Sequence, residues 1–170
     1  GDAVEVTGTV KEFRAGGAGS TNLTITEIDN PGRTVTVLSN GNPLPAPTVI
    51  GTGGWAPPAT VIEDDTTSDV EVNNASFDPA QDGLDFYESL ESMLVRLNDA
   101  VAVGPTTSFG EIAVGGDNGV FAGLRTPRGG IIIRPGDFNP ERIILDDTLA
   151  AVPLVNTGDT FPGSLVGVVD

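Results

Sequence analysis

The chain has 170 residues, of which 38% are hydrophobic and only 5% aromatic, so a core of Val, Ile, Leu and Ala is expected. Its formal net charge of −16 repels polyanions and argues against non-specific nucleic-acid binding by the surface as a whole. His and Cys are both absent, which excludes Ser-His and Cys-His nucleophiles, disulfides and the common zinc sites.

The first 39 residues predict three strands. Apolar and polar residues alternate over residues 3–14 and 22–28, and residues 33–39 continue the pattern. Gly8 lies inside the first of these segments, where a glycine often marks a bulge or a strong bend. The sequence Asp-Asn-Pro-Gly at residues 29–32 predicts a turn between the second and third strands.

Residues 51–82 interrupt this rhythm. They are polar, acidic and rich in turn-forming residues, which predicts an irregular excursion with at most one short strand near residues 70–72.

The only convincing helix is predicted over residues 84–92. Phe86 and Leu90 are four positions apart and fall on one helix face, and Asp82 or Asp85 is suited to cap the first turn.

The rest of the chain predicts further short strands. Asn118 and Gly119 are suited to a turn with positive φ, and Pro162 places the start of the last strand at a sheet edge. The predicted strands are residues 93–103, 109–114, 130–134, 142–145 and 159–169.

This order predicts an all-β fold. Three strands, a helix and two further strands match an OB-fold-like Greek-key barrel with one short helix between strands 3 and 4, followed by additional β segments. The expected domains are an OB-fold-like barrel over residues 1–120, with the acidic excursion at 51–82, and a β extension or the start of a second, truncated β module over 121–170.

Several segments together resemble the region that precedes the catalytic domain in secreted bacterial nucleases of the endonuclease/exonuclease/phosphatase superfamily. They are GDAVEVTGTVKEF, VLSNGNPLPAPTVI, FYESLESMLVRL, FGEIAV, RTPRGGIIIRPGDFNPERIILDD and TGDTFPGSLVGVVD, and together they cover nearly all of the chain outside about 51–82.

The resemblance implies an OB-fold-like, non-catalytic accessory module of an extracellular nuclease. It would position the catalytic domain or the nucleic-acid substrate, and the parent polypeptide would be a metal-dependent nuclease. No catalytic residue carries over, because the superfamily's catalytic motifs and its His are missing here. The resemblance implies a downstream nuclease domain of the same polypeptide as the partner. The start at Gly1 and the end at Asp170 look like those of a segment cut from a longer chain. No membrane partner is expected.

Arginines are the candidate nucleic-acid contacts, because a guanidinium forks to phosphate and stacks on bases. The alternative interpretation is pairing with Asp137, Glu141, Asp146 and Asp147 in the same stretch, and the predicted barrel face lacks stacking aromatics. Any binding of DNA is expected to be weak. The candidates are Arg125, Arg128 and Arg134 near the C-terminal half, with Arg14 and Arg33 on the predicted barrel face.

The acidic excursion is a candidate calcium site, although the chain is not expected to require a cofactor. Hard cations favour clustered carboxylates, but the spacing here does not match an EF-hand, and a solvated acidic loop is the alternative interpretation. The candidate ligands are Asp64, Asp65, Asp69, Asp78 and Asp82.

Two other functions stay open beside the nuclease accessory role. The chain is also typical of a structural or assembly module of an extracellular protein, with self-assembly and no nucleic-acid contact. An enzyme in its own right would have to use Glu88, Glu91 and Glu111 for acid–base chemistry, and a solvated helix face is the favoured interpretation of the first two.

Overall fold

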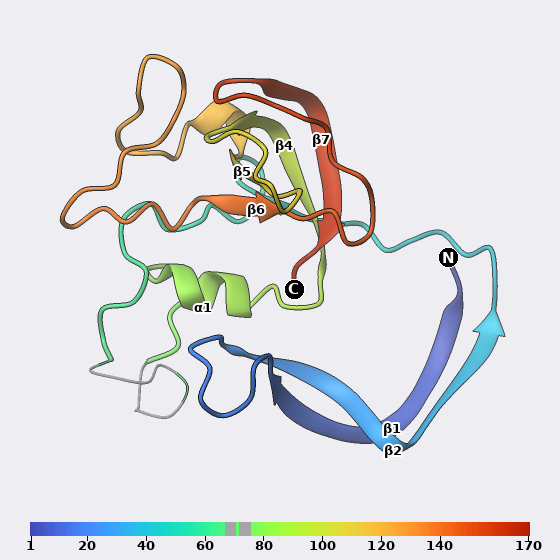
Figure 1. The fold of residues 1–170 in the computed structure, drawn as a ribbon. Helices are drawn as coiled ribbons and strands as arrows, with labels where there is room; N and C mark the ends of the chain where they lie inside the picture. Colours follow the sequence, from blue (N-terminus) through green and yellow to red (C-terminus); the bar gives the residue numbers. More distant parts are fainter. Residues whose placement is uncertain (67–70, 72–75) are drawn as a thin grey trace. The chain divides into compact units, whose positions relative to one another are not determined.

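The structure is a computed structural model that describes residues 1–66, 71 and 76–170 (Figure 1). It divides into two compact units, one of Gly1–Ala46 with Asp170 and the other of Pro47–Val169. Strands dominate both units, and the α-helix lies between the third and fourth strands. The all-β class with one short helix at this place is therefore confirmed.

The first unit is a two-stranded antiparallel ribbon. β1 (Ala3–Arg14) pairs with β2 (Thr24–Ser39) along its whole length, and the Gly-rich connection after β1 turns through the bond from the Gly17 N–H to the Arg14 carbonyl (3.0 Å). The second and third predicted strands are therefore one continuous strand.

A bulge replaces the predicted turn at the middle of β2. Thr7 pairs with Thr34, and Thr9 pairs with Asp29. The pairing therefore moves by two residues along β1 but by five residues along β2. The surplus residues after Asp29 are absorbed opposite Gly8, where the absence of a side chain leaves room for them. The prediction of a turn was wrong, and the prediction of a bulge or bend at Gly8 is confirmed.

The second unit contains an open five-stranded sheet (Figure 1). Four of its strands follow the order β3-β4-β5-β6, and the fifth, β7, pairs with β4. β3 runs parallel to β4, and the remaining pairs are antiparallel. Among the described residues β7 pairs only with β4, so it is the edge strand that Pro162 predicted. The predicted OB-type barrel stays unconfirmed. The strands are β3 (Thr48–Ile50), β4 (Leu94–Ala102), β5 (Ile112–Gly115), β6 (Ile143–Leu145) and β7 (Thr160–Val168).

Two predicted elements of this unit differ from the structure. Residues 130–134 form no strand and take part only in isolated bridges, Arg125 with Ile131 and Arg134 with Asp137. The predicted turn after β5 is a short 3₁₀ helix, η1 (Asp117–Gly119), in which Asn118 (φ 57°) has the positive φ that its sequence predicted.

The helix α1 (Gly83–Glu88) is shorter than predicted. It ends because Leu90 N–H bonds to the Tyr87 carbonyl three residues back (3.0 Å), so the chain continues as turns. Glu91 therefore lies beyond the helix and does not share a helical side with Glu88. The predicted apolar pair is nevertheless in the core, with Phe86 2% and Leu90 0% exposed. The core joins them to β3, β4 and β5 through Ile50, Leu97, Ala100, Ala102, Ile112 and Val114.

The division between the units follows Ala46, whereas the sequence predicted a boundary near residue 120. The physical reason is strand pairing, because β6 and β7 complete the sheet that β3, β4 and β5 begin. The strand predicted near residues 70–72 lies outside the described residues, apart from Glu71, which is in a turn. In the described part of the chain, no helix is long and apolar enough to cross a membrane.

Candidate functional site: an acidic cluster beside the helix

Four carboxylates of the second unit gather around that of Asp82, the residue that precedes α1. Glu63, Asp82 and Asp85 form one group, and Asp65, Asp78 and Asp82 form another. In each group one carboxylate oxygen of each residue lies within 4.8 Å of the others. Asp82 belongs to both groups and is therefore the centre of the cluster.

Backbone hydrogen bonds explain why residues about 20 positions apart meet. The N–H of Gly83 donates to the carbonyl of Val61 (3.1 Å), and the N–H of Leu84 donates to the carbonyl of Ile62 (3.0 Å). These two bonds hold the start of α1 beside the segment that carries Glu63. The acidic residues on the two segments are thereby brought to one place.

Further bonds tie the rest of the cluster together. Asp85 accepts a bond from the N–H of Asp78 (2.7 Å), and both oxygens of Asp65 accept from the N–H of Ser76 (3.0 Å each). The N–H of Asp82 donates to the Asp78 carbonyl (3.2 Å). The carboxylates are therefore held by main-chain contacts and not by cationic side chains.

The centre of the cluster is buried without hydrogen-bond partners. Asp82 is 1% exposed, and among the described residues neither of its carboxylate oxygens has a hydrogen-bond partner. Asp82 occupies the predicted N-cap position, but its side chain makes no cap hydrogen bond. One buried oxygen each of Glu63 and Asp78 also lacks a partner.

The buried carboxyl group of Asp82 is a weaker acid than an ordinary aspartate. Burial, followed by the neighbouring carboxylate of Asp78 and the charges of Glu63 and Asp64, raises the pKa of Asp82 to about 6. The ion pairs of Lys11 and Arg134 involve carboxylates outside this cluster.

The structure brings together three of the five predicted ligands, Asp65, Asp78 and Asp82. Asp64 is exposed and belongs to neither group, and Asp69 lies outside the described residues. The sequence analysis missed Glu63 and Asp85. Both lie in or beside the acidic stretch, but the backbone pairing that moves them next to Asp82 leaves no local sequence signal.

The predicted arginine contacts have mainly internal roles. Arg125 donates to the carbonyls of Asn118 (2.7 Å) and Gly129 (3.0 and 3.2 Å), and it thereby holds two loops together. Arg134 pairs with Asp137 at 3.1 Å. Arg134 thus forms the ion pair that the alternative interpretation predicted. Arg125 instead bonds to backbone carbonyls.

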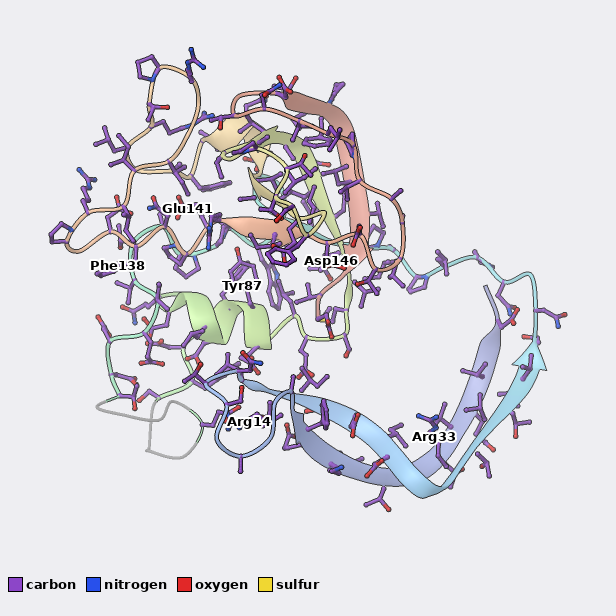
Figure 2. The ribbon with its side chains drawn as sticks, in the orientation of Figure 1. Arg14, Arg33, Tyr87, Phe138, Glu141 and Asp146 are labelled. Atoms are coloured by element: carbon purple, nitrogen blue, oxygen red, sulfur yellow. The ribbon has the colours of Figure 1, made fainter. Side chains whose placement is uncertain are left out.

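The other predicted arginines are distributed over both units. Arg14 and Arg33 lie at separate places on the β1–β2 ribbon (Figure 2), and Arg14 donates to the carbonyl of Asn22. Arg128 lines an open hollow of ≈ 460 Å³ in the second unit. No hydrogen bond or ion pair joins Arg128 to another described residue. The hollow is also lined by Val103, Pro105, Thr126, Gly130, Asn156 and Thr157.

A second buried polar group lies near the helix. Tyr87 points from α1 toward the segment that carries Glu141 (Figure 2), and burial, followed by the charge of Glu141, raises the pKa of its hydroxyl. Glu141 is 4% exposed, and burial and then the charge of Asp137 raise its own pKa, while Arg142 opposes this. These groups are separate from the acidic cluster, because none of them belongs to its two carboxylate groups.

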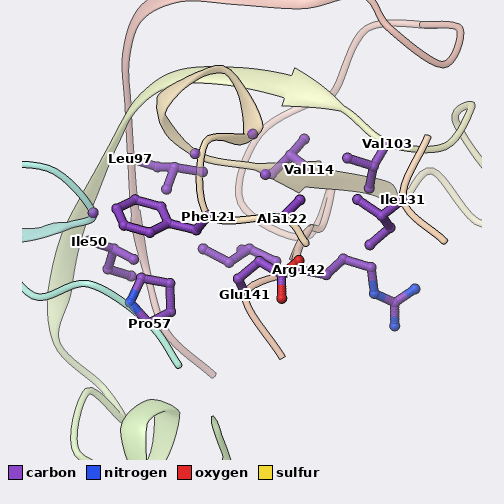
Figure 3. Close-up of a pocket in the computed structure, with 15 residues that line it drawn as sticks. Ile50, Pro57, Leu97, Val103, Val114, Phe121, Ala122, Ile131, Glu141 and Arg142 are labelled. Carbon is purple, nitrogen blue, oxygen red and sulfur yellow. The ribbon is translucent and has the colours of Figure 1, made fainter. Parts of the chain in front are cut away.

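The enclosed cavity of the second unit has the wrong size and lining for a substrate. It measures ≈ 10 Å³, about the room that one water requires. Ile50, Leu97 and Phe121 point into it, and the guanidinium of Arg142 extends away from it (Figure 3). This cavity is therefore a packing defect of the core.

A family model described as "Domain of unknown function (DUF8508)" matches residues 49–170. The match nearly coincides with the second structural unit and includes the whole acidic cluster. No curated protein and no solved structure matches the chain.

Proposed function

We propose that this chain, which belongs to the DUF8508 family of unknown function, is a non-catalytic accessory module of a secreted bacterial nuclease. Its role is to position the catalytic domain of the same polypeptide by protein contact. The resemblance of its segments to the region before such catalytic domains supports this role. The absence of His and Cys from the whole sequence supports a role without chemistry of its own.

The observation that carries the proposal is an exposed apolar face on the β1–β2 ribbon. Val4 pairs with Val37, Val6 with Val35, and Val10 with Ile28, and directly paired residues share a face. All six side chains are exposed, from 37% for Val6 to 69% for Val10. The neighbouring pairs, such as Thr7 with Thr34 and Lys11 with Glu27, make the opposite face mainly polar.

A ribbon of this kind gains stability when its apolar face is covered. Isolated two-stranded hairpins are marginally stable in water, and contiguous exposed apolar side chains mark interaction surfaces. Each square ångström of apolar surface removed from water contributes about 25 cal/mol. We assign the cover to the catalytic domain of the same polypeptide, since the resemblance places such a domain in the same chain.

The charges of the module favour protein contact over nucleic-acid contact. The net charge of −16 opposes the approach of a polyanion. Arg125 and Arg134 were predicted from the sequence to contact phosphates. Instead, Arg125 donates to a loop carbonyl and Arg134 pairs with the buried carboxylate of Asp137. The number of cations left for phosphates is small, and phosphate contacts provide most of the affinity of non-specific binding.

The test is association of the purified chain with the separately produced catalytic domain, measured by sedimentation velocity. Lysines at the paired apolar positions (Val6→Lys with Val35→Lys) should weaken association at least tenfold. Lysines at the adjacent pair on the polar face (Thr7→Lys with Thr34→Lys) are the control of equal charge and should leave it unchanged. No association of the wild-type proteins, or equal loss in both variants, would refute the proposal. Self-association of the chain alone, lost only in the first variant, would favour the assembly role instead.

A second candidate function, direct contact with nucleic acid, is favoured by one observation. Arg128 lines an open hollow beside Thr126, Asn156 and Thr157, which are hydrogen-bonding groups that suit a phosphate. Fluorescence anisotropy with labelled single-stranded and duplex DNA tests it. Binding at low salt that Arg128→Ala abolishes, and that Arg33→Ala leaves intact, would establish this function. Absence of binding at low salt would leave the role in protein contact.

A further inference from the structure

We propose that Glu63, Asp65, Asp78, Asp82 and Asp85 form a calcium site that fastens the acidic loop to the start of α1. The site lies wholly in the second unit, and it is independent of the ribbon face and of the arginines. It uses only described residues. Its role is structural, and it adds a dependence on Ca²⁺ to the module's stability.

The first argument is the arrangement of the oxygens. Two groups of three carboxylates share Asp82, and within each group one oxygen of each residue lies within 4.8 Å of the others. Oxygens that all contact one Ca²⁺ at about 2.3–2.6 Å are necessarily separated by no more than twice that distance. The observed spacing within each group is therefore compatible with a cation that contacts Asp82 and the two other carboxylates of that group.

The second argument is the missing partners at the centre. Asp82 is 1% exposed, and no donor in the described part of the chain bonds to either of its oxygens. Glu63 Oε2 and Asp78 Oδ1 are also buried and unpartnered. Buried carboxylates are normally paired with a cation, bonded to donors or bound to a metal. Here a bound cation would supply a partner to the buried oxygens of Asp82 and of a neighbouring carboxylate.

The third argument is that main-chain bonds orient the carboxylates without using all their oxygens. Glu63 Oε1 accepts from the N–H of Asp65 (2.9 Å), which leaves Oε2 free for another contact. Asp78 Oδ2 accepts from the Gln81 side chain (3.1 Å), which leaves Oδ1 free. Ligand carboxylates in metal sites are commonly held by such secondary contacts.

The chemistry of the donors selects the cation. The chain contains no His or Cys, so soft metals and zinc lose their preferred ligands. Mg²⁺ demands a near-ideal octahedron and retains waters, whereas Ca²⁺ accepts six to eight oxygens in irregular geometry. A cluster of five carboxylates on a loop and a helix start fits Ca²⁺ better. For extracellular modules, Ca²⁺ dissociation constants of about 10⁻⁴–10⁻³ M are usual.

The experiment is isothermal titration of the whole chain, freed of metal by chelation, with CaCl2 and in parallel with MgCl2. We expect one Ca²⁺ per chain and Mg²⁺ affinity at least tenfold weaker. In thermal unfolding, Tm should rise by about 5 °C at a Ca²⁺ concentration near 100 times the dissociation constant. No binding of Ca²⁺ up to about 10 mM, or binding of Mg²⁺ at equal affinity, would overturn the proposal.

Matched variants locate the site. Asp82→Asn preserves the shape of the central side chain and should weaken Ca²⁺ binding at least tenfold. Asp64→Asn removes a charge from the same loop at an exposed position outside both groups, and it should change the affinity by less than threefold. Equal affinity of the Asp82→Asn variant and wild type, or equal loss in both variants, would overturn the assignment.

A folding defect can be separated from loss of the site. Without metal, Asp82→Asn should unfold at the same temperature as wild type or higher, because it removes an uncompensated buried charge. Asp78→Asn provides an independent second test and should also weaken Ca²⁺ binding. If Asp78→Asn folds and binds Ca²⁺ as wild type does, the proposed ligand set is wrong.

Discussion

Arg134 binds Asp137 through two guanidinium nitrogens that meet the same carboxylate oxygen, Nε and Nη2, each at 3.1 Å from Oδ2. The Asp137 side chain is 3% exposed, whereas that of Arg134 is 52% exposed. The arginine therefore compensates a buried charge from a partly exposed position. Its role in the fold explains its presence without any nucleic-acid partner.

Arg134→Ala should consequently destabilise the protein. Removing the guanidinium leaves the Asp137 carboxylate buried and unpaired, which should cost about 1–3 kcal/mol after allowance for the exposure of Arg134. Arg128→Ala is the control and should change stability by less than about 0.5 kcal/mol. Urea denaturation at pH 7 measures both changes. Equal stability of the two variants would contradict this account of Arg134.

Gly8→Ala should destabilise the β1–β2 ribbon. A Cβ at Gly8 would lie 2.5 Å from Ile28 Cγ2 and 3.2 Å from the Asp29 carbonyl oxygen, so the bulge would have to shift. The expected cost is about 1–3 kcal/mol. Hydrogen exchange of the ribbon amides measures it, and Gly19→Ala is the control because a Cβ there meets nothing within 4 Å.

A double variant tests the cause of that effect. Ile28→Ala removes the methyl group that meets the new Cβ, so the cost of Gly8→Ala should be smaller in the Ile28→Ala background. Strictly additive effects of the two substitutions would show that the contact with Ile28 is not the cause.

Leu90→Ala should destabilise the second unit strongly, although Leu90 lies just beyond the end of α1. Its side chain is fully buried in the core cluster, and a cavity of this kind costs about 2–5 kcal/mol. Leu154→Ala is the control, because Leu154 is 92% exposed. Chemical denaturation followed by circular dichroism compares them. Similar stabilities would mean that Leu90 is not part of the core.

Glu141→Gln should alter the dependence of stability on pH. Burial, and then the charge of Asp137, raises the pKa of Glu141 in the folded state above its ordinary value of 4.5. Below that ordinary value both states carry the proton, and the contribution to stability is complete. As the pH rises through the raised pKa, the folded state must give up the proton and the free energy of unfolding falls.

The variant should therefore lose less stability than wild type between acidic and neutral pH. Urea denaturation in chelator-containing buffers measures this difference. The raised pKa of Asp82 acts in the same direction in both proteins and cancels in the comparison. Parallel curves for the two proteins would contradict the assignment to Glu141.

The sequence by itself determined the all-β class, the ribbon strand β1, the bulge at Gly8 and the place of the helix. These features depend on local properties, namely alternation of apolar residues, the absence of a side chain at glycine, and the four-residue spacing of Phe86 and Leu90. Such signals are contained within a few neighbouring residues.

Only the tertiary structure decided what depends on pairing between distant segments. The turn signal after Asp29 became a bulge because β1 supplies a continuous partner on both sides of it. Arg134 became a structural residue because Asp137 is buried beside it. Glu63 joined Asp82 because backbone bonds hold the segments before and after the loop together. Each outcome depends on which groups the folded chain removes from water, and no local pattern in the sequence records that.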